Sequence, residues 1–129
     1  MSMKITLAGN MKINAEYGSF TIKTDQSKKE GGDGTAPAPY QLFLASIGTC
    51  AAAYVAGFCQ SRNIPTEGIE LEQKMVYDPV KKKMGQIKIY IKLPPDFPEK
   101  YKHTVIKAAE SCAVKKTILD PPEFVIEAM

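Results

Sequence analysis

Arginine is nearly absent from this chain. Only one of its 17 basic residues, Arg62, is an arginine, and the formal net charge at pH 7 is +3. Nucleic-acid interfaces favour arginine because its guanidinium group makes bidentate and stacking contacts. The basic residues are also spread along the chain instead of forming one run. We therefore expect no nucleic-acid partner.

The sequence also has little that would direct it to a membrane. The N-terminal residues lack an apolar core of signal-peptide length. The longest apolar run, residues 40–59, is broken by polar residues and glycine, whereas a membrane span needs roughly 20 predominantly apolar residues. Three cysteines without an export signal fit a reducing compartment. We therefore expect a cytoplasmic protein that does not associate with a membrane.

Motifs for metals and cofactors are missing as well. The chain has no CxxC pair, and its only histidine, His103, lies nine residues from the nearest cysteine, so we expect an exposed helix residue there. The glycine-rich residues 31–34, "GGDG", lack the Lys-Ser/Thr of a P-loop and the spacing of a dinucleotide site. We therefore expect neither a metal nor a cofactor.

The residues that are present alternate in short patterns around one long apolar segment. The expected elements, in chain order, are a meander within residues 3–24, a loop at 25–39, a helix at 40–62, a hairpin of strands at 69–78 and 85–93, a helix from residue 98, and a last strand at 123–128. Ser111 either continues the second helix or caps a new one starting at Cys112. This pattern predicts a single α+β domain, residues 1–129, without a βαβ repeat.

The expected helix at residues 40–62 is apolar nearly all round. At 1.5 Å per residue it would be roughly 34 Å long. Helices that are hydrophobic on every face lie inside a protein. A chain of 129 residues is short for covering such a helix on all sides. The sequence therefore predicts that a second subunit supplies part of the cover.

Two of the three cysteines lie on this helix. Cys50 and Cys59 are nine residues apart, which places them on opposite faces and roughly 13 Å apart along the axis. A disulfide needs Cα atoms within about 7 Å, so these two cannot pair while the helix is intact. Any redox partner of Cys50 within its own fold is therefore Cys112. Cys59 is interpreted as a core residue.

Two segments of the sequence carry a family resemblance. "APAPYQLFLASIGTCAAAYVAGFCQSRNI", residues 36–64, resembles the central helix of the OsmC/Ohr family, and "AAESCAVKKTI", residues 108–118, is similar to its second cysteine segment. The resemblance extends over nearly the whole chain in the order of its strands and helices. It implies an OsmC-like fold, with antiparallel sheets around a long buried central helix in an intertwined homodimer.

The resemblance also implies an activity. In the family's peroxidases the first cysteine reduces organic hydroperoxides and the second closes the resulting sulfenic acid into a disulfide. Carried over, Cys50 would be the peroxidatic and Cys112 the resolving cysteine. The implied reductant is a dithiol, such as a lipoylated protein. The alternative is a dimeric binding module that uses its apolar groove for a small ligand without catalysis.

The chain departs from the peroxidase pattern at two places. The resemblance implies a glutamate ten residues before the first cysteine, where this chain has Tyr40, and an arginine on the N-terminal strands, where it has none. Lys12 or Lys23 could replace that arginine, as point charges without its bidentate fork. Burial opposes ionisation of a thiol, so the pKa of Cys50 is expected near or above the ordinary value of about 8.5.

Overall fold

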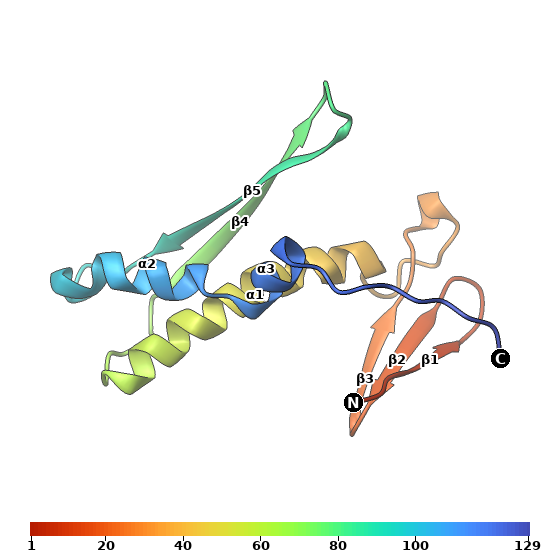
Figure 1. Cartoon of the computed structure of the whole chain (residues 1–129), viewed down its shortest axis with the longest axis horizontal. Coiled ribbons are helices and arrows are strands. Elements are labelled where there is room, and N and C mark those ends of the chain that lie inside the picture. Colours follow the sequence, from red (N-terminus) through yellow and green to blue (C-terminus); the bar gives the residue numbers. More distant parts are fainter. The chain divides into compact units, whose positions relative to one another are not determined.

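The computed structural model describes residues 1–129 of the chain. It contains two compact units, Met1–Ala45 and Ser46–Met129. The boundary falls inside the long helix α1, Pro39–Ser61, so the first turns of this helix belong to the first unit. Each unit is built from its own antiparallel strands (Figure 1).

The first unit is a three-stranded antiparallel meander, as its sequence predicts. Its strands are β1, Lys4–Leu7; β2, Ile13–Tyr17; and β3, Phe20–Thr24, in the order β1-β2-β3. The turn before β2 places Gly9 and Asn10 at positive φ, and the turn before β3 does so with Gly18. Gly and Asn tolerate this left-handed region, which explains why the breaks fall there.

One face of this sheet is apolar and stays open to solvent. Ile5, Ala15 and Ile22 are paired in register across the three strands and therefore share a face. Leu7 and Phe20 lie on the same face, and their side chains are 83% and 68% exposed. Apolar faces of sheets normally pack against another layer. The first unit by itself does not supply that layer.

The loop after β3 is organised by the buried carboxylate of Asp25. This carboxylate accepts hydrogen bonds from the Thr35 hydroxyl at 2.6 Å and from the backbone N–H groups of Thr35 and Gln26 at 3.0 and 2.8 Å. These bonds, led by that of the Thr35 hydroxyl, hold the pKa of Asp25 far below its ordinary value. Gly32 is required here, because a Cβ atom would lie 2.1 Å from the Gln26 carbonyl oxygen.

The second unit contains most of α1 and a long hairpin of strands β4, Glu70–Asp78, and β5, Lys83–Lys92. Two shorter helices follow, α2, Lys102–Glu110, and α3, Ala113–Leu119. The one-turn 3-10 helices at Lys28–Glu30 and Glu99–Tyr101 complete the elements of the chain. The α+β class with antiparallel sheets is thus confirmed.

Helix α1 begins where the sequence predicts. Pro39 occupies its first position, where the missing N–H costs no hydrogen bond. The Gln41 side chain accepts a hydrogen bond from the Ala38 N–H at 2.9 Å, as in a capping box. By length and composition the helix could cross a membrane, but core helices of soluble proteins meet the same two criteria.

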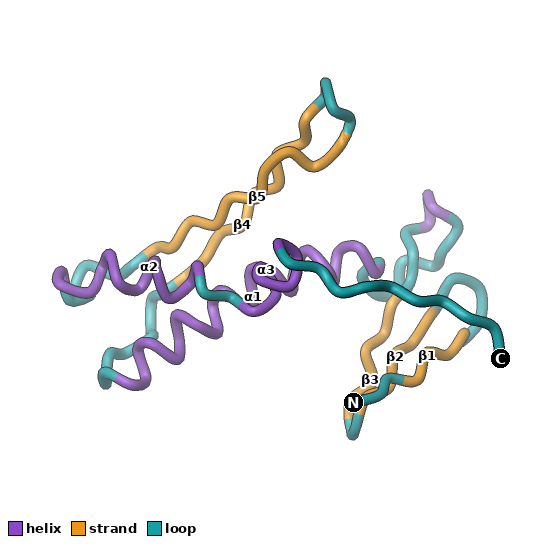
Figure 2. The backbone as a smooth tube through the Cα atoms, viewed as in Figure 1, coloured by secondary structure: helices purple, strands orange, loops and turns teal.

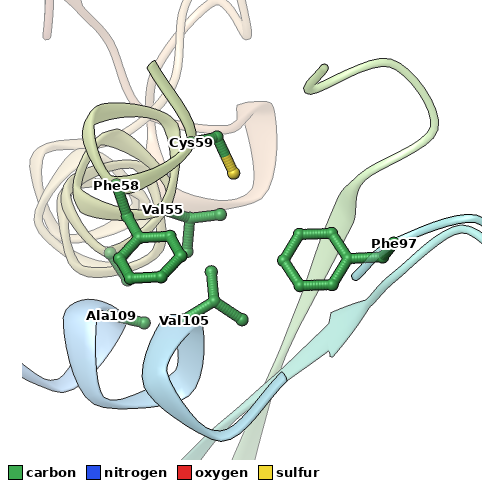
Figure 3. Close-up of a cluster of buried hydrophobic side chains, with 7 residues drawn as sticks. Val55, Phe58, Cys59, Phe97, Val105 and Ala109 are labelled. Carbon is green, nitrogen blue, oxygen red and sulfur yellow. The ribbon is translucent and has the colours of Figure 1, made fainter. Parts of the chain in front are cut away.

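The core of the second unit forms where α1 meets α2 and the loop before α2. Figure 3 shows Val55 and Phe58 of α1 facing Val105 and Ala109 of α2, with Phe97 closing one side. Val105 is fully buried. Burying each such valine or phenylalanine side chain stabilises the fold by about 1.5–3 kcal/mol. This packing holds α2, and with it the segment that follows, against α1.

The expected C-terminal strand is not formed. Residues 121–129 have no regular secondary structure and are exposed throughout, with Phe124 at 83% and Ile126 at 97% (Figure 2). The alternating pattern was sufficient to predict a strand, but a strand also needs a neighbour for its backbone hydrogen bonds. No strand of this chain pairs with the segment.

Candidate active site

Cys50 and Cys112 come from segments far apart in the sequence. Cys50 lies near the middle of α1 and is half-buried, whereas Cys112 is buried with only 2% of its surface exposed. Helix α2 ends at Glu110 with Ser111 as its C-cap, and Cys112 then adopts an extended conformation with φ −52° and ψ 127° immediately before α3. A new helix does follow, as in the second possibility, but Cys112 is its N-cap and Ser111 closes the helix before it.

The break brings hydrogen-bond donors to the Cys50 sulfur. The backbone N–H groups of Val114 and Ala113 and the Cys112 thiol all lie close enough to this sulfur to act on its pKa. The Cys112 thiol itself donates to the carbonyl oxygen of Ile47, one turn before Cys50 on α1, with sulfur and oxygen 3.9 Å apart. All three cysteines are free thiols. The two cysteines of the expected redox pair are thus direct neighbours.

These donors lower the pKa of Cys50 below its ordinary value. The Val114 N–H has the largest effect, the Cys112 thiol the next, and the Ala113 N–H adds a smaller one, while burial opposes them. Hydrogen bonds to a charged group favour its charged form. The expectation of an ordinary or raised pKa was therefore wrong in direction, because it considered burial and missing cations but not backbone amides.

Cys59 is a core residue, as the sequence predicts. Its side chain is fully buried in the cluster with Val55, Phe97 and Val105 (Figure 3). Burial raises the pKa of Cys59, and the charge of Arg62 opposes that effect only in part. A thiol held neutral and away from solvent is a poor nucleophile. Cys59 therefore has the environment of a structural residue.

Arg62, the chain's only arginine, lies away from Cys50 at the end of α1. Its guanidinium carbon is 3.8 Å from the centre of the Phe58 ring, and its Nη1 donates to the Phe58 carbonyl oxygen at 3.3 Å and to the Ser61 hydroxyl at 2.9 Å. Cys50 lies roughly 18 Å back along the helix axis. The arginine of the family's peroxidases thus has no equivalent in Arg62.

The other residues of the expected site lie in the first unit. Tyr40 stacks on Phe43, with ring centres 5.9 Å apart. The ammonium group of Lys12 pairs with the carboxylate of Asp33, which raises the pKa of Lys12 and lowers that of Asp33. Lys12 and Lys23 line one cavity of about 310 Å³ in this unit. Lys12 already has a carboxylate partner there.

His103 is exposed on α2, as expected.

An apolar groove of about 570 Å³ runs along the face of α1 that carries Cys50. Ala53, Tyr54 and Gly57 line it, and they follow Cys50 by three, four and seven residues, the spacing of one helix face. Ala108 and Ser111 of the second cysteine segment form its opposite wall. The sequence did not predict the residues that line this groove, although the small residues at helical spacing after Cys50 are a usable signal.

The donors to Cys50 were also missed, and no side-chain pattern could have revealed them. Val114 and Ala113 act through their backbone N–H groups, which are the unpaired donors of a first helical turn. Their identity as valine and alanine carries no signal. Only the position of the helix break, one residue before Cys112, determines that these groups point at Cys50.

Comparison with known proteins gives one family and a consistent fold. The sequence model of the OsmC-like protein family matches residues 32–127. The structure resembles a protein of Psychrobacter arcticus 273-4 with a TM-score of 0.75 and 21% identity, over 91% of this chain and 87% of the other.

Two further solved structures agree. An OsmC-like protein of Mycoplasma pneumoniae gives a TM-score of 0.67 at 14% identity, over 93% of this chain and 87% of the other. An organic hydroperoxide resistance protein, OsmC, of Legionella pneumophila gives 0.54 at 19% identity, over 91% and 87%. No curated protein matches the sequence significantly. The family match covers most of the chain, and the chain therefore belongs to the OsmC-like protein family.

Proposed function

We propose that this protein is a cytoplasmic thiol peroxidase that reduces organic hydroperoxides in defence against oxidative stress, with Cys50 as the attacking and Cys112 as the resolving cysteine. One feature carries the proposal: the Val114 and Ala113 N–H groups and the second thiol, Cys112, all lie beside Cys50 and favour its thiolate. The name of the similar Legionella pneumophila protein, an organic hydroperoxide resistance protein, supports the choice of substrate.

The first step is attack by the Cys50 thiolate on the outer oxygen of the hydroperoxide. A sulfur–oxygen bond forms while the oxygen–oxygen bond breaks, and the leaving alkoxide takes up a proton to become an alcohol. Cys50 is thereby oxidised to a sulfenic acid. The Val114 and Ala113 amides raise the fraction of reactive thiolate without any cation, since they stabilise the anion by hydrogen bonds.

The second step closes the disulfide. The Cys112 sulfur attacks the Cys50 sulfur, the new sulfur–sulfur bond replaces the sulfur–oxygen bond, and the departing hydroxide leaves as water with the proton of the Cys112 thiol. The position of the Cys112 thiol supports this assignment, because it donates to the Ile47 carbonyl oxygen one turn before Cys50 and also acts on the pKa of Cys50. A dithiol, such as a lipoylated protein, then reduces the disulfide by two exchange reactions and is itself oxidised.

The groove on α1 supports an organic rather than an inorganic peroxide. It continues the face of Cys50 and is lined mainly by apolar and small side chains, among them Ala53, Tyr54 and Gly57. An alkyl or aryl group would bury apolar surface there, whereas hydrogen peroxide has none to bury. The same groove also favours the second candidate function, a dimeric module that binds a small apolar ligand without catalysis.

We also propose a homodimer. The solvent-accessible surface of the chain is 9994 Å². Two separate compact proteins with the masses of its two units would together expose only roughly 8,000 Å². The uncovered face of β1, β2 and β3 and the unpaired segment 121–129 both need a partner. A second copy would supply a layer for the first and a strand edge for the second.

Intact-mass analysis after one equivalent of cumene hydroperoxide tests the proposed function. The wild-type protein should lose two hydrogen atoms, and Cys112→Ser should gain one oxygen atom and then react with dimedone. Cys50→Ser should remain unchanged. Cys59→Ser is the matched control and should behave as the wild type. Equal peroxide consumption by the wild type and Cys50→Ser would instead favour the binding module.

A further inference from the structure

Another cavity, separate from the groove beside Cys50, lies in the second unit at the end of α1 that is remote from Cys50. Its volume is about 630 Å³. Ile64 and Pro65 after α1 form one wall, and Pro94, Phe97 and Tyr101 before α2 form the other. Cavities of several hundred cubic ångströms that combine apolar side chains with a few polar groups are typical of small-molecule sites. Neither Cys50 nor Cys112 takes part in it.

Both walls of the cavity are held in place by the chain itself. The Ile64 N–H donates to the Cys59 carbonyl oxygen at 2.9 Å, and the N–H groups of Phe97 and Tyr101 donate to carbonyl oxygens three residues earlier at 3.0 Å. Proline, with its fixed φ, occurs in both walls. Ordering such a site upon binding would cost little conformational entropy.

Each wall carries one positive and one negative side chain. Arg62 and Glu67 come from the wall after α1, and Asp96 and Lys100 from the wall before α2. None of these four groups takes part in an ion pair, because the three ion pairs of the chain involve other residues. The cavity therefore presents two unpaired charges of each sign at its solvent-exposed rim, beside proline and aromatic side chains.

Arg62 is held in position without using its full hydrogen-bonding capacity. Stacking on Phe58 and two hydrogen bonds from Nη1 fix the guanidinium plane, and both of these bonds leave Nε and Nη2 available to a ligand. Arg62 and Lys100 also approach the same Tyr101 ring, at 5.6 and 5.0 Å. Two cations beside one ring, one with a free fork, form a site for a carboxylate.

We propose that this cavity binds a short peptide with free amino and carboxylate ends. The carboxylate would lie on Arg62 and Lys100, the ammonium group on Glu67 and Asp96, and an apolar side chain against Pro65 and Pro94. Because the lining carries two positive and two negative side chains, it matches a ligand that carries both signs better than a simple anion.

The dipeptide Gly-Leu is a suitable probe, titrated into the full-length reduced protein and followed by NMR. We expect saturable shifts at the amides of Asn63, Phe97 and Lys100. N-acetyl-Gly-Leu and Gly-Leu-amide, which each lack one charge, should bind about tenfold more weakly or worse. Shifts that never saturate, or equal binding of the capped peptides, would overturn the proposal. So would stronger competition by inorganic phosphate, which would indicate a simple anion site.

Two variants assign the contacts. Lys100→Gln should weaken Gly-Leu binding about tenfold, while Lys107→Gln, an exposed lysine of α2 outside the cavity, should leave it unchanged. Arg62→Lys keeps the charge but loses the fork and should also weaken binding. All three variants should retain wild-type reactivity of Cys50. Unchanged binding in both Lys100→Gln and Arg62→Lys would refute the assignment.

Discussion

Replacing Val114 with proline removes the backbone N–H that contributes most to lowering the pKa of Cys50. Val114 is the second residue of α3, where the N–H has no partner within the helix, so proline removes no helical hydrogen bond. Its one cost is that Ala113, the residue before it, is helical, and thermal denaturation of the variant measures that cost. The first backbone hydrogen bond of this helix, from the Lys116 N–H to the Cys112 carbonyl oxygen at 3.1 Å, stays intact. The change thus removes one donor and leaves the thiols in place.

The size of the effect follows from the strength of a hydrogen bond to a charged group. Such a bond contributes about 1.5–3 kcal/mol, and a shift of one pKa unit corresponds to about 1.4 kcal/mol. Because the N–H favours the thiolate, its loss should raise the pKa of Cys50. The rate of a thiolate reaction below the pKa should then fall about tenfold or more at a given pH.

The assay is the pH dependence of Cys50 alkylation by iodoacetamide, measured on the Cys50 peptide by mass spectrometry. The plateau of the rate should move to higher pH in Val114→Pro. Val114→Ala, which keeps the N–H, is the matched control and should follow the wild type. Ala113→Pro should give a smaller shift, since its N–H contributes less and the ψ of 127° at Cys112 suits a following proline. Identical profiles for Val114→Pro and Val114→Ala would show that the amide does not hold the thiolate.

Three further predictions concern the fold and the thiols. Light scattering should give twice the chain mass of 14.2 kDa, and deletion of residues 121–129 should shift the protein toward monomer; a well-folded wild-type monomer at micromolar concentration would contradict the proposed dimer. Peptide mapping after oxidation should find Cys50 joined to Cys112 and Cys59 reduced, and Cys59 in the bridge would contradict the helix-face argument. Asp25→Asn should lower the thermal midpoint at pH 7, because its amide cannot accept all the bonds that the carboxylate accepts. Since the folded-state pKa of Asp25 is lowered, the stabilisation by its charge is present above the unfolded-state pKa of about 4 and is lost as the pH falls below it. The difference between the two proteins in thermal denaturation should therefore shrink in acid, and a constant difference would argue against the role of the charge.

The absence of an arginine near Cys50 has a different meaning once the structure is known. From the sequence, it predicted a thiol that ionises with difficulty. In the structure, backbone amides of α3 act on the thiol instead, and Arg62 has other contacts at the far end of α1. An amide carries no net charge and cannot bind a peroxide as a guanidinium does. The proposed peroxidase would thus differ from its relatives mainly in how it binds the substrate, and less in how it stabilises the thiolate.

The sequence by itself determined the elements and the separation of the cysteines. Alternation of apolar and polar residues with period two predicted the meander and the hairpin. The apolar run with Pro39 predicted both ends of α1 to within one residue. The helical period placed Cys59 on the face opposite to Cys50, and the structure buries it in the core. These features depend on neighbours within a few residues, so local patterns contain the necessary information.

Only the tertiary structure decided what surrounds the thiol. The donors to Cys50 are N–H groups more than 60 residues away in sequence, and they reach the sulfur because α2 packs on α1 and ends two residues before Cys112. Segment 121–129 had the pattern of a strand but lacks a neighbour to pair with. In both cases the outcome depends on which backbone groups meet across the fold. Side-chain patterns do not encode this, because every residue except proline carries the same N–H and C=O groups.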